Sequence, residues 1–210
     1  FYQLDSALIY IKMAESSYPN EKINEKEKLK IHGIDKESIN KQKHIIAELA
    51  YEDAFELFTV ESMDHFINQY DFSKDYGRAI DIRDSLDFEI AASVNTYSAY
   101  NEFLKKYPDS KFYQEAFSRY ERRLFEEKTA EGGLEVYEKF VRQFPKNPYV
   151  SICMDSIYDI FITANTVENY YAFINNYPEN KNVSDAWKKV YRLYNSDYTK
   201  ERIVEFRIDF

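Results

Sequence analysis

One short motif recurs along this chain at a nearly constant interval. It consists of an aromatic residue, two variable residues, Phe, an aliphatic residue, two more variable residues and then Tyr or Phe, usually followed by Pro. The central Phe stands at Phe66, Phe103, Phe140 and Phe173, so the copies are 37, 37 and 33 residues apart. Repetition of one unit at such an interval predicts stacked structural repeats. These copies are called the repeat motif below.

The apolar residues of the repeat motif follow helical spacing. Tyr97, Tyr100, Phe103, Leu104 and Tyr107 are 3, 3, 1 and 3 residues apart, which places them on one face of an α-helix. Residues suited to an N-cap precede the copies, mostly Thr, at Thr59, Thr96, Gly133, Thr166 and Thr199. The Pro after the motif ends the helix, because it disfavours the αR conformation in the residue before it. Each motif is therefore predicted to be a helix of about three turns.

A second amphipathic helix is predicted after each of the three clear motifs, over residues 111–129, 148–164 and 183–195. Two helices in about 35 residues form a helical hairpin, which cannot bury its apolar face alone. Neighbouring hairpins must therefore stack. The sequence predicts an all-α protein built as a solenoid.

These residues resemble the tetratricopeptide repeat (TPR). Thr96 takes its small-residue slot, Tyr100 its aromatic slot and Pro108 its terminal proline. The string Phe-Leu-Lys-Lys-Tyr-Pro-Asp-Ser at 103–110 is similar to the repeats of bacterial envelope lipoproteins that help assemble outer-membrane proteins. The resemblance covers residues 59–210 and, more loosely, 1–58. It implies an α-α superhelix, a right-handed solenoid of TPR-like hairpins forming one domain over residues 1–210, in the periplasm or cell envelope in preference to the cytoplasm.

The sequence departs from the TPR pattern at two slots. The central Phe of the repeat motif stands where that family has a small residue. The slot for Gly in the first helix holds Ser118, Asp155 and Lys188. We therefore expect the helix pairs to sit further apart than in a standard array, with aromatic rings between them.

Composition excludes several classes of protein. A net charge of −9 over 210 residues opposes nucleic-acid binding, which depends on neutralising phosphates with Lys and Arg. No apolar run approaches the roughly 20 residues that a membrane span needs. The single cysteine, Cys153, excludes an internal disulfide framework and is predicted to be a core residue.

Both ends of the sequence differ from the regular repeats. Residues 1–58 are predicted to be a divergent part, in which Tyr18 and Pro19 close an earlier motif and 20–43 form a charged insertion. Helices are expected over 21–32, stopped by Gly33, and over 38–58. At the other end Phe210 occupies the slot before the expected Pro, so the last repeat is truncated. We expect the chain to be a fragment of a longer protein.

Residue clusters typical of catalysis or metal binding are not found in the sequence, and no cofactor is expected. His65 is predicted to face solvent. Asp81, Asp84 and Asp87 are spaced three apart and spread around a helix, so they are not expected to converge on a cation. The Tyr and Phe residues of the motif are predicted to form the core between repeats.

The repeat motif corresponds to the second helix of the TPR, so a binding surface is expected on the other helix of each pair, which lines the inner wall in TPR arrays. Carrying that wall across gives five cations as candidate partner-binding residues: Arg78, Arg119, Arg122, Lys189 and Arg192. Guanidinium and ammonium groups arranged in this way could grip a carboxylate of an acidic peptide or the terminal carboxylate of a protein. Scattered surface charges are the alternative interpretation.

Three functions are consistent with this pattern. The first is a non-enzymatic repeat scaffold for protein–protein interaction, expected to be a module of a larger bacterial envelope protein. The second is a spacer or docking region for a catalytic or membrane-associated domain beyond residue 210. The third is an enzyme with a site between repeats, which the missing catalytic clusters disfavour.

Overall fold

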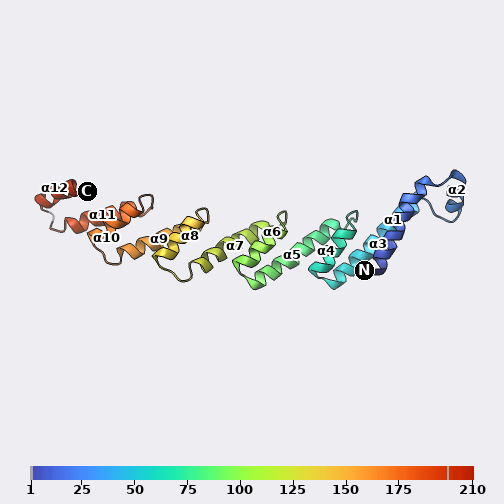
Figure 1. Ribbon diagram of the computed structural model, residues 1–210, viewed down its shortest axis with the longest axis horizontal. Helices are drawn as coiled ribbons and strands as arrows, with labels where there is room; N and C mark the ends of the chain where they lie inside the picture. The colour runs from blue at the N-terminus through green and yellow to red at the C-terminus, as the bar shows by residue number, and fades with distance from the viewer. Residues whose placement is uncertain (1, 198) are drawn as a thin grey trace. The chain divides into compact units, whose positions relative to one another are not determined.

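The computed structural model describes residues 2–197 and 199–210, which form helices joined by short loops, with no strand among them (Figure 1). The predicted all-α class is therefore confirmed. Contacts between Cα atoms divide the chain into two compact units, Phe1–Phe117 and Ser118–Phe210. The division falls within helix α7 (Tyr113–Lys128).

The first unit is a succession of helices that pack on their neighbours in sequence. Its elements are α1 (Tyr2–Ser17), the 3-10 turn η1 (Tyr18–Asn20), α2 (Ile23–Ile31), α3 (Lys36–Leu57), α4 (Val60–Gln69), α5 (Tyr76–Val94) and α6 (Tyr97–Lys106). Helix α1 packs on α3, α3 on α4, α4 on α5 and α5 on α6. This order is consistent with a helical repeat fold.

The second unit follows the same rule. Its further elements are α8 (Leu134–Gln143), α9 (Val150–Ile162), α10 (Val167–Asn176), α11 (Val183–Tyr194) and α12 (Lys200–Asp209). Helices α8 to α12 each pack on the next one in sequence. The helices predicted over 111–129, 148–164 and 183–195 are α7, α9 and α11, with ends that differ from the prediction by at most two residues.

The predicted caps and stops of the repeat-motif helices are confirmed. The side chains of Thr59, Thr96, Thr166 and Thr199 each accept a hydrogen bond from a backbone N–H three residues later. At the other end the backbone leaves helical geometry at Tyr107, where φ is −131° and ψ is 68°, directly before Pro108. Tyr70, which precedes Asp71 instead of Pro, adopts a similar conformation.

The central Phe of the repeat motif forms the core in every copy. Phe66, Phe103, Phe140 and Phe173 are 0, 3, 1 and 0% exposed. Each contacts an aromatic ring 15 residues earlier, on the preceding helix, in the pairs Tyr51–Phe66, Phe88–Phe103, Phe125–Phe140 and Tyr158–Phe173, with ring centroids 4.9–5.6 Å apart. The aromatic core predicted from the sequence is therefore confirmed, and the partner at −15 is an additional regularity.

The Tyr that ends a repeat motif can reach a carboxylate on an earlier helix of the same kind. Tyr70 of α4 donates a hydrogen bond to Asp5 Oδ1 of α1, 3.0 Å away, and Tyr177 of α10 donates one to Glu138 Oε1 of α8. Burial is the larger cause and these hydrogen bonds the next, and together they raise the pKa of each phenol far above the usual value for tyrosine. The bonds tie together helices that are not adjacent in the packing order.

His65 departs from the expectation of a solvent-facing side chain. It is half-buried, and its Nε2 lies 2.9 Å from Asp5 Oδ2. The N-terminal turns of α1 reach the C-terminal half of α4, so Asp5 contacts both His65 and Tyr70. Sequence spacing could not place this contact, because the two residues are 60 positions apart.

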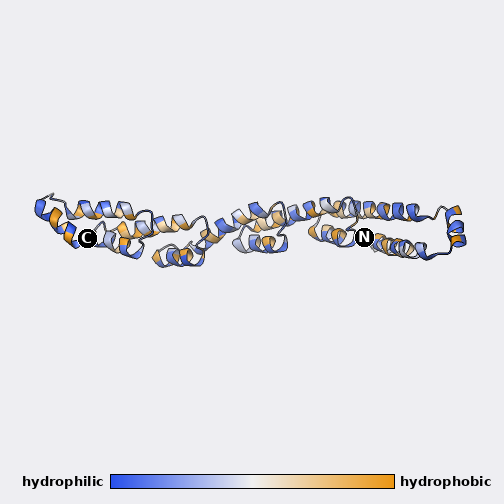
Figure 2. Ribbon diagram, turned by 90° about the horizontal axis from the view of Figure 1, so that it is seen from above, coloured by the Kyte–Doolittle hydropathy of each residue, from blue (hydrophilic) through white to orange (hydrophobic). Residues whose placement is uncertain are grey.

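The charged N-terminal insertion forms helices close to those predicted. Helix α2 is followed by Gly33 in a left-handed conformation, with φ 72°. Helix α3 begins with a capping box, in which Asp35 accepts from the N–H of Ser38 at 2.8 Å. Figure 2 shows hydrophilic residues along the first turns of α3. Among the described residues, no helix combines the length and apolar character required to cross a bilayer.

Candidate functional site

A groove on the second unit lies between α11 and α12. It is lined by Ser184, Trp187, Lys188, Tyr191, Arg192 and Phe206 and has a volume of about 620 Å³. Trp187 and Tyr191 are four residues apart on α11, and so are Lys188 and Arg192. Because residues at i and i+4 stack along one face of a helix, an aromatic stripe runs beside a cationic one. We call this site the α11–α12 groove.

Aromatic contacts hold α12 against α11. Phe206 of α12 meets the edge of Tyr191, with centroids 5.2 Å apart at 87°, and Phe210 meets Trp187 at 6.0 Å. Tyr194 adds a hydrogen bond from its hydroxyl to Asp209 Oδ2 at 2.5 Å. This bond raises the pKa of the Tyr194 phenol. The floor of the groove is therefore made of rings whose positions depend on the packing of α12.

The cations of the groove are available for a ligand. Lys188 and Arg192 are exposed, and neither forms an ion pair with any residue that the structure describes. The nearby Arg202 differs, because it lies 3.3 Å from Glu205. The lining residues include no carboxylate among those that the structure describes. In a protein of net charge −9, this groove is locally positive and can bind an anion against an apolar surface.

The five cations predicted from the sequence occupy different environments. Arg192 lines the groove, and Lys189 is half-buried beside it on α11. Arg119 and Arg122 are exposed on α7, in the same unit. Arg122 Nε lies 2.8 Å from Glu126 Oε1, and Arg123 donates a hydrogen bond to Oε2 of the same carboxylate. A ligand at Arg122 would therefore compete with Glu126.

Arg78 belongs to the first unit. It is exposed on α5, and its guanidinium carbon is 5.8 Å from the ring centroids of both Tyr51 and Phe55. Stacking of this kind leaves the edge of the guanidinium open to a carboxylate. A single inner wall that combines Arg78 with the cations of the second unit stays a prediction.

Residue types that could hold a metal or act in catalysis are dispersed in the described part of the protein. No group of three His, Cys, Asp or Glu residues there could hold a metal ion. Asp81, Asp84 and Asp87 each face a different cation, namely Lys111, Arg83 and Lys106. Cys153 is buried, as predicted, and desolvation raises the pKa of its thiol to about 11.

Sequence reasoning misses most of the α11–α12 groove. The repeat pattern indicates no ligand contact at Lys188, Tyr191 or Phe206, and it places Trp187 on a helix face like any other core residue. Two signals could have pointed to them. Trp187 is the only Trp in the sequence, and Lys188 and Arg192 repeat at a helical interval beside it.

No protein-family model matches the sequence, and a search of curated proteins found no similar sequence.

Proposed function

We propose that this protein is a non-enzymatic repeat scaffold that binds an acidic segment of a partner protein in the α11–α12 groove. The observation that supports this most is that Lys188 and Arg192 lie together beside the rings of Trp187 and Tyr191. Neither cation has a counter-ion among the described residues. Arg and Trp are frequent among the residues that dominate binding energy at protein interfaces.

The groove favours a ligand with two neighbouring features. A carboxylate can accept two parallel hydrogen bonds from the Arg192 guanidinium, with Lys188 adding charge at one end. An apolar or aromatic group of the same ligand can cover the edges of Trp187 and Phe206, which are partly exposed. We therefore expect acidic peptides with an aromatic residue to bind better than acidic peptides without one.

A fluorescence titration tests this proposal. Because Trp187 is the only Trp, its emission reports occupancy of the groove directly. We expect an acidic, Phe-containing peptide to change the emission, and the double variant Lys188→Ala, Arg192→Ala to weaken binding by about tenfold or more. The matched control is Arg202→Ala on α12, which removes a cation already paired with Glu205. Equal affinities of the groove variant and the control would contradict the proposal.

We also propose the finer architecture and setting that the repeat motif implies. The hairpins would stack as a right-handed, TPR-like superhelix, in a module of a bacterial envelope protein. Recurrence at 37, 37 and 33 residues and packing between successive helices support the stacking. An experimental structure of the protein tests the handedness, and fractionation of producing cells tests the location. A left-handed array, or a protein confined to the cytosol, would contradict these points.

A further inference from the structure

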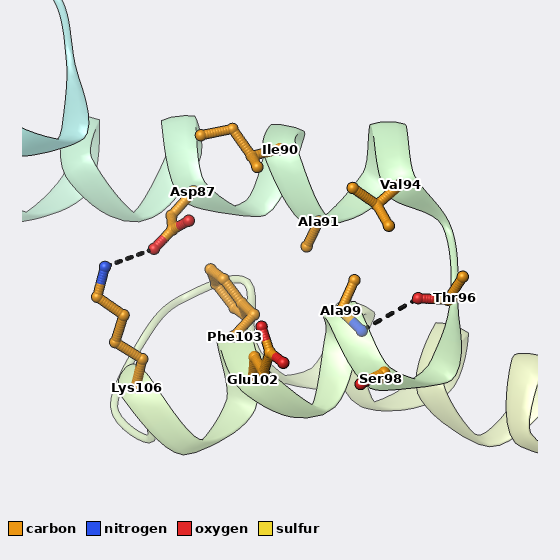
Figure 3. A pocket seen from close by; sticks show the side chains of 10 residues that line it. All are labelled: Asp87, Ile90, Ala91, Val94, Thr96, Ser98, Ala99, Glu102, Phe103 and Lys106. Carbon is orange, nitrogen blue, oxygen red and sulfur yellow. Dashed lines mark hydrogen bonds and ion pairs between the residues drawn. The ribbon is translucent and has the colours of Figure 1, made fainter.

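Two adjoining hollows on the first unit share the side chain of Ile90. One, of about 440 Å³, lies between the start of α4 and α5 and includes Phe58. The other, of about 390 Å³, lies between α5 and α6 and includes Val94 and Phe103 (Figure 3). Phe58, Ile90 and Val94 are 51, 54 and 58% exposed, so three large apolar side chains face solvent at one place. We call this surface the α5 groove.

Phe58 occupies a backbone position that does not suit its side chain. Its φ is 50°, in the left-handed region. The equivalent positions of the later repeats hold Asn95, Gly132 and Asn165, with φ of 57°, 66° and 50°. Asn and Gly tolerate this conformation, whereas a bulky residue is strained in it. The first copy therefore keeps a strained and exposed Phe, and such strain is found preferentially at binding sites.

The next repeat shows that the exposed apolar residues are not needed for folding. The next repeat has a corresponding hollow of about 300 Å³. Phe140, which is 37 residues after Phe103, takes the place of Phe103 in its lining. There Glu127 stands in place of Ile90, and Glu131 in place of Val94. A hairpin of this type thus folds with charged residues at both positions. The packing of a hairpin of this type therefore does not require apolar residues at the positions of Ile90 and Val94.

The rim of the α5 groove is acidic. Glu61, Glu89 and Glu102 line it, and none of them forms an ion pair with a residue that the structure describes. The one lining cation in the described hollows, Lys106, lies 2.9 Å from Asp87 and is neutralised by it (Figure 3). Charge complementarity therefore selects a cationic ligand.

We propose that the α5 groove binds a basic amphipathic helical segment of a partner protein. Apolar side chains on one face of such a helix would cover Phe58, Ile90 and Val94, and flanking Lys or Arg would approach the glutamates of the rim. Anchors at helical spacing in an apolar groove are a recurrent mode of peptide recognition. The surface is distinct from the α11–α12 groove, and its ligand has the opposite charge.

Synthetic peptides and the intact protein test this proposal. The probe is a peptide with Leu at helical spacing and Lys elsewhere, and the peptide control replaces each Leu by Ser while keeping every Lys. We expect the Leu/Lys peptide to bind by calorimetry, and the Ser/Lys peptide to bind at least about tenfold more weakly. Binding should weaken as salt is added, because the rim charges become screened. Absence of Leu/Lys binding, or equal binding of the two peptides, overturns the proposal.

Variants based on the other repeats separate binding from folding. Ile90→Gln with Val94→Gln places neutral counterparts of Glu127 and Glu131 at these positions, so apolar surface is lost without added charge that would attract the Lys-rich peptide, and we expect about a tenfold loss of affinity or more with helical content unchanged. Phe58→Asn should weaken binding while raising the urea midpoint of unfolding, because it relieves the left-handed strain. A merely structural role for Phe58 would not combine these two effects. The control is Ile31→Gln, the same kind of replacement on α2 at a residue that is 83% exposed.

Two further outcomes decide between occupants. If the protein self-associates in sedimentation experiments, and the Ile90/Val94 variant abolishes this, a second copy occupies the groove and the partner-peptide proposal is wrong. If the variant binds the Leu/Lys peptide as the wild type does, the groove is not the binding site. Helical content by circular dichroism and the urea midpoint of unfolding show in either case whether the variant is folded, and neither measurement depends on the α11–α12 groove, so the two proposals fail independently.

Discussion

The hydroxyl of Tyr170 donates a hydrogen bond to Oδ1 of Asn165, 3.0 Å away. Tyr100 donates the equivalent hydrogen bond to Oδ1 of Asn95, 3.1 Å away, in an earlier copy of the repeat that also carries Asn. Each Asn has a left-handed backbone and directly precedes the Thr that caps the next helix. The Asn therefore serves two purposes, because it tolerates the left-handed turn conformation and accepts a hydrogen bond from the hydroxyl of a buried Tyr.

The first prediction concerns the two purposes of Asn165. Asn165→Ala removes the acceptor and places a Cβ-bearing residue without a polar side chain in the left-handed region, so we expect a loss of about 2 kcal/mol or more in the free energy of unfolding. Asn165→Gly removes only the acceptor, because Gly adopts this conformation freely, and should cost about 1 kcal/mol. Urea unfolding measures both. Equal stability of the Ala variant and the wild type would show that neither purpose matters.

The bond itself can be isolated with Tyr170→Phe. Removing the hydroxyl in the wild type should cost more than removing it from Asn165→Gly, and the difference should be about 1 kcal/mol. The preceding repeat has Gly132 and Tyr137 at the positions of Asn165 and Tyr170, so it is a natural counterpart of the Asn165→Gly variant. A Cβ on Gly132 would lie 3.5 Å from the Tyr137 hydroxyl, so the two positions are as close there. Strictly additive effects at Asn165 and Tyr170 would mean that the bond contributes no net stability.

Local sequence determined the helices with little ambiguity. Thr96 supplies the first turn with an acceptor and Pro108 prevents the last turn from continuing, so both ends of α6 are set by neighbouring residues. The burial of Phe103 follows from helical spacing. The partnership of Phe103 with Phe88 is equally periodic, but it becomes visible only when the stagger between successive helices is known.

Contacts between helices limited what could be predicted of the sites. The position of Arg192 on a helix face identifies it from sequence, whereas Phe206 enters the groove because α12 packs back on α11. His65 meets Asp5 for a similar reason, since that contact joins α1 to α4. The left-handed conformation of Phe58 opposes the preference of its own side chain, so no propensity rule predicts it.

The second prediction is a pH dependence at Tyr177. Burial, and then the hydrogen bond to Glu138, raises the pKa of this phenol in the folded protein above its unfolded value of about 10. The neutral phenol is thus favoured by folding. Its contribution to stability is complete below pH of about 10 and is lost as the pH rises through the folded pKa.

Alkaline difference spectroscopy measures this effect. Tyr177→Phe should remove one tyrosinate component from the alkaline titration of absorbance. The missing component should have a higher pKa than free tyrosine. The replacement is sterically reasonable, because Phe144 occupies the equivalent slot of the preceding repeat. A missing component that titrates at the normal pKa would contradict the expectation.

The third prediction concerns the central Phe of the repeat motif. Phe173 is fully buried, and its ring lies 4.9 Å from Tyr158 and 5.5 Å from Tyr177. Phe173→Ala should lower the free energy of unfolding by about 3–5 kcal/mol, because it leaves a cavity between helices. Ile160→Ala, at a partly exposed position on α9, is the control and should cost less than about 1 kcal/mol. Similar losses in urea unfolding would argue against an aromatic core at this seam.

The fourth prediction concerns the reactivity of Cys153. The side chain is buried in α9, and desolvation raises the pKa of its thiol to about 11. At pH 8 about one thiol in a thousand is therefore ionised, and burial also blocks access of a reagent. We expect a thiol reagent to modify the native protein far more slowly than the protein unfolded in urea.

Two replacements distinguish a packing role of Cys153 from a chemical one. Cys153→Ala removes a small apolar group and should destabilise the protein modestly, by about 1 kcal/mol. Cys153→Ser has nearly the same shape but buries a hydroxyl in an apolar site, so it should cost more than the Ala variant. If the native thiol reacts as fast as the unfolded one, or if Ser is tolerated better than Ala, Cys153 is accessible to solvent and does not form part of the core.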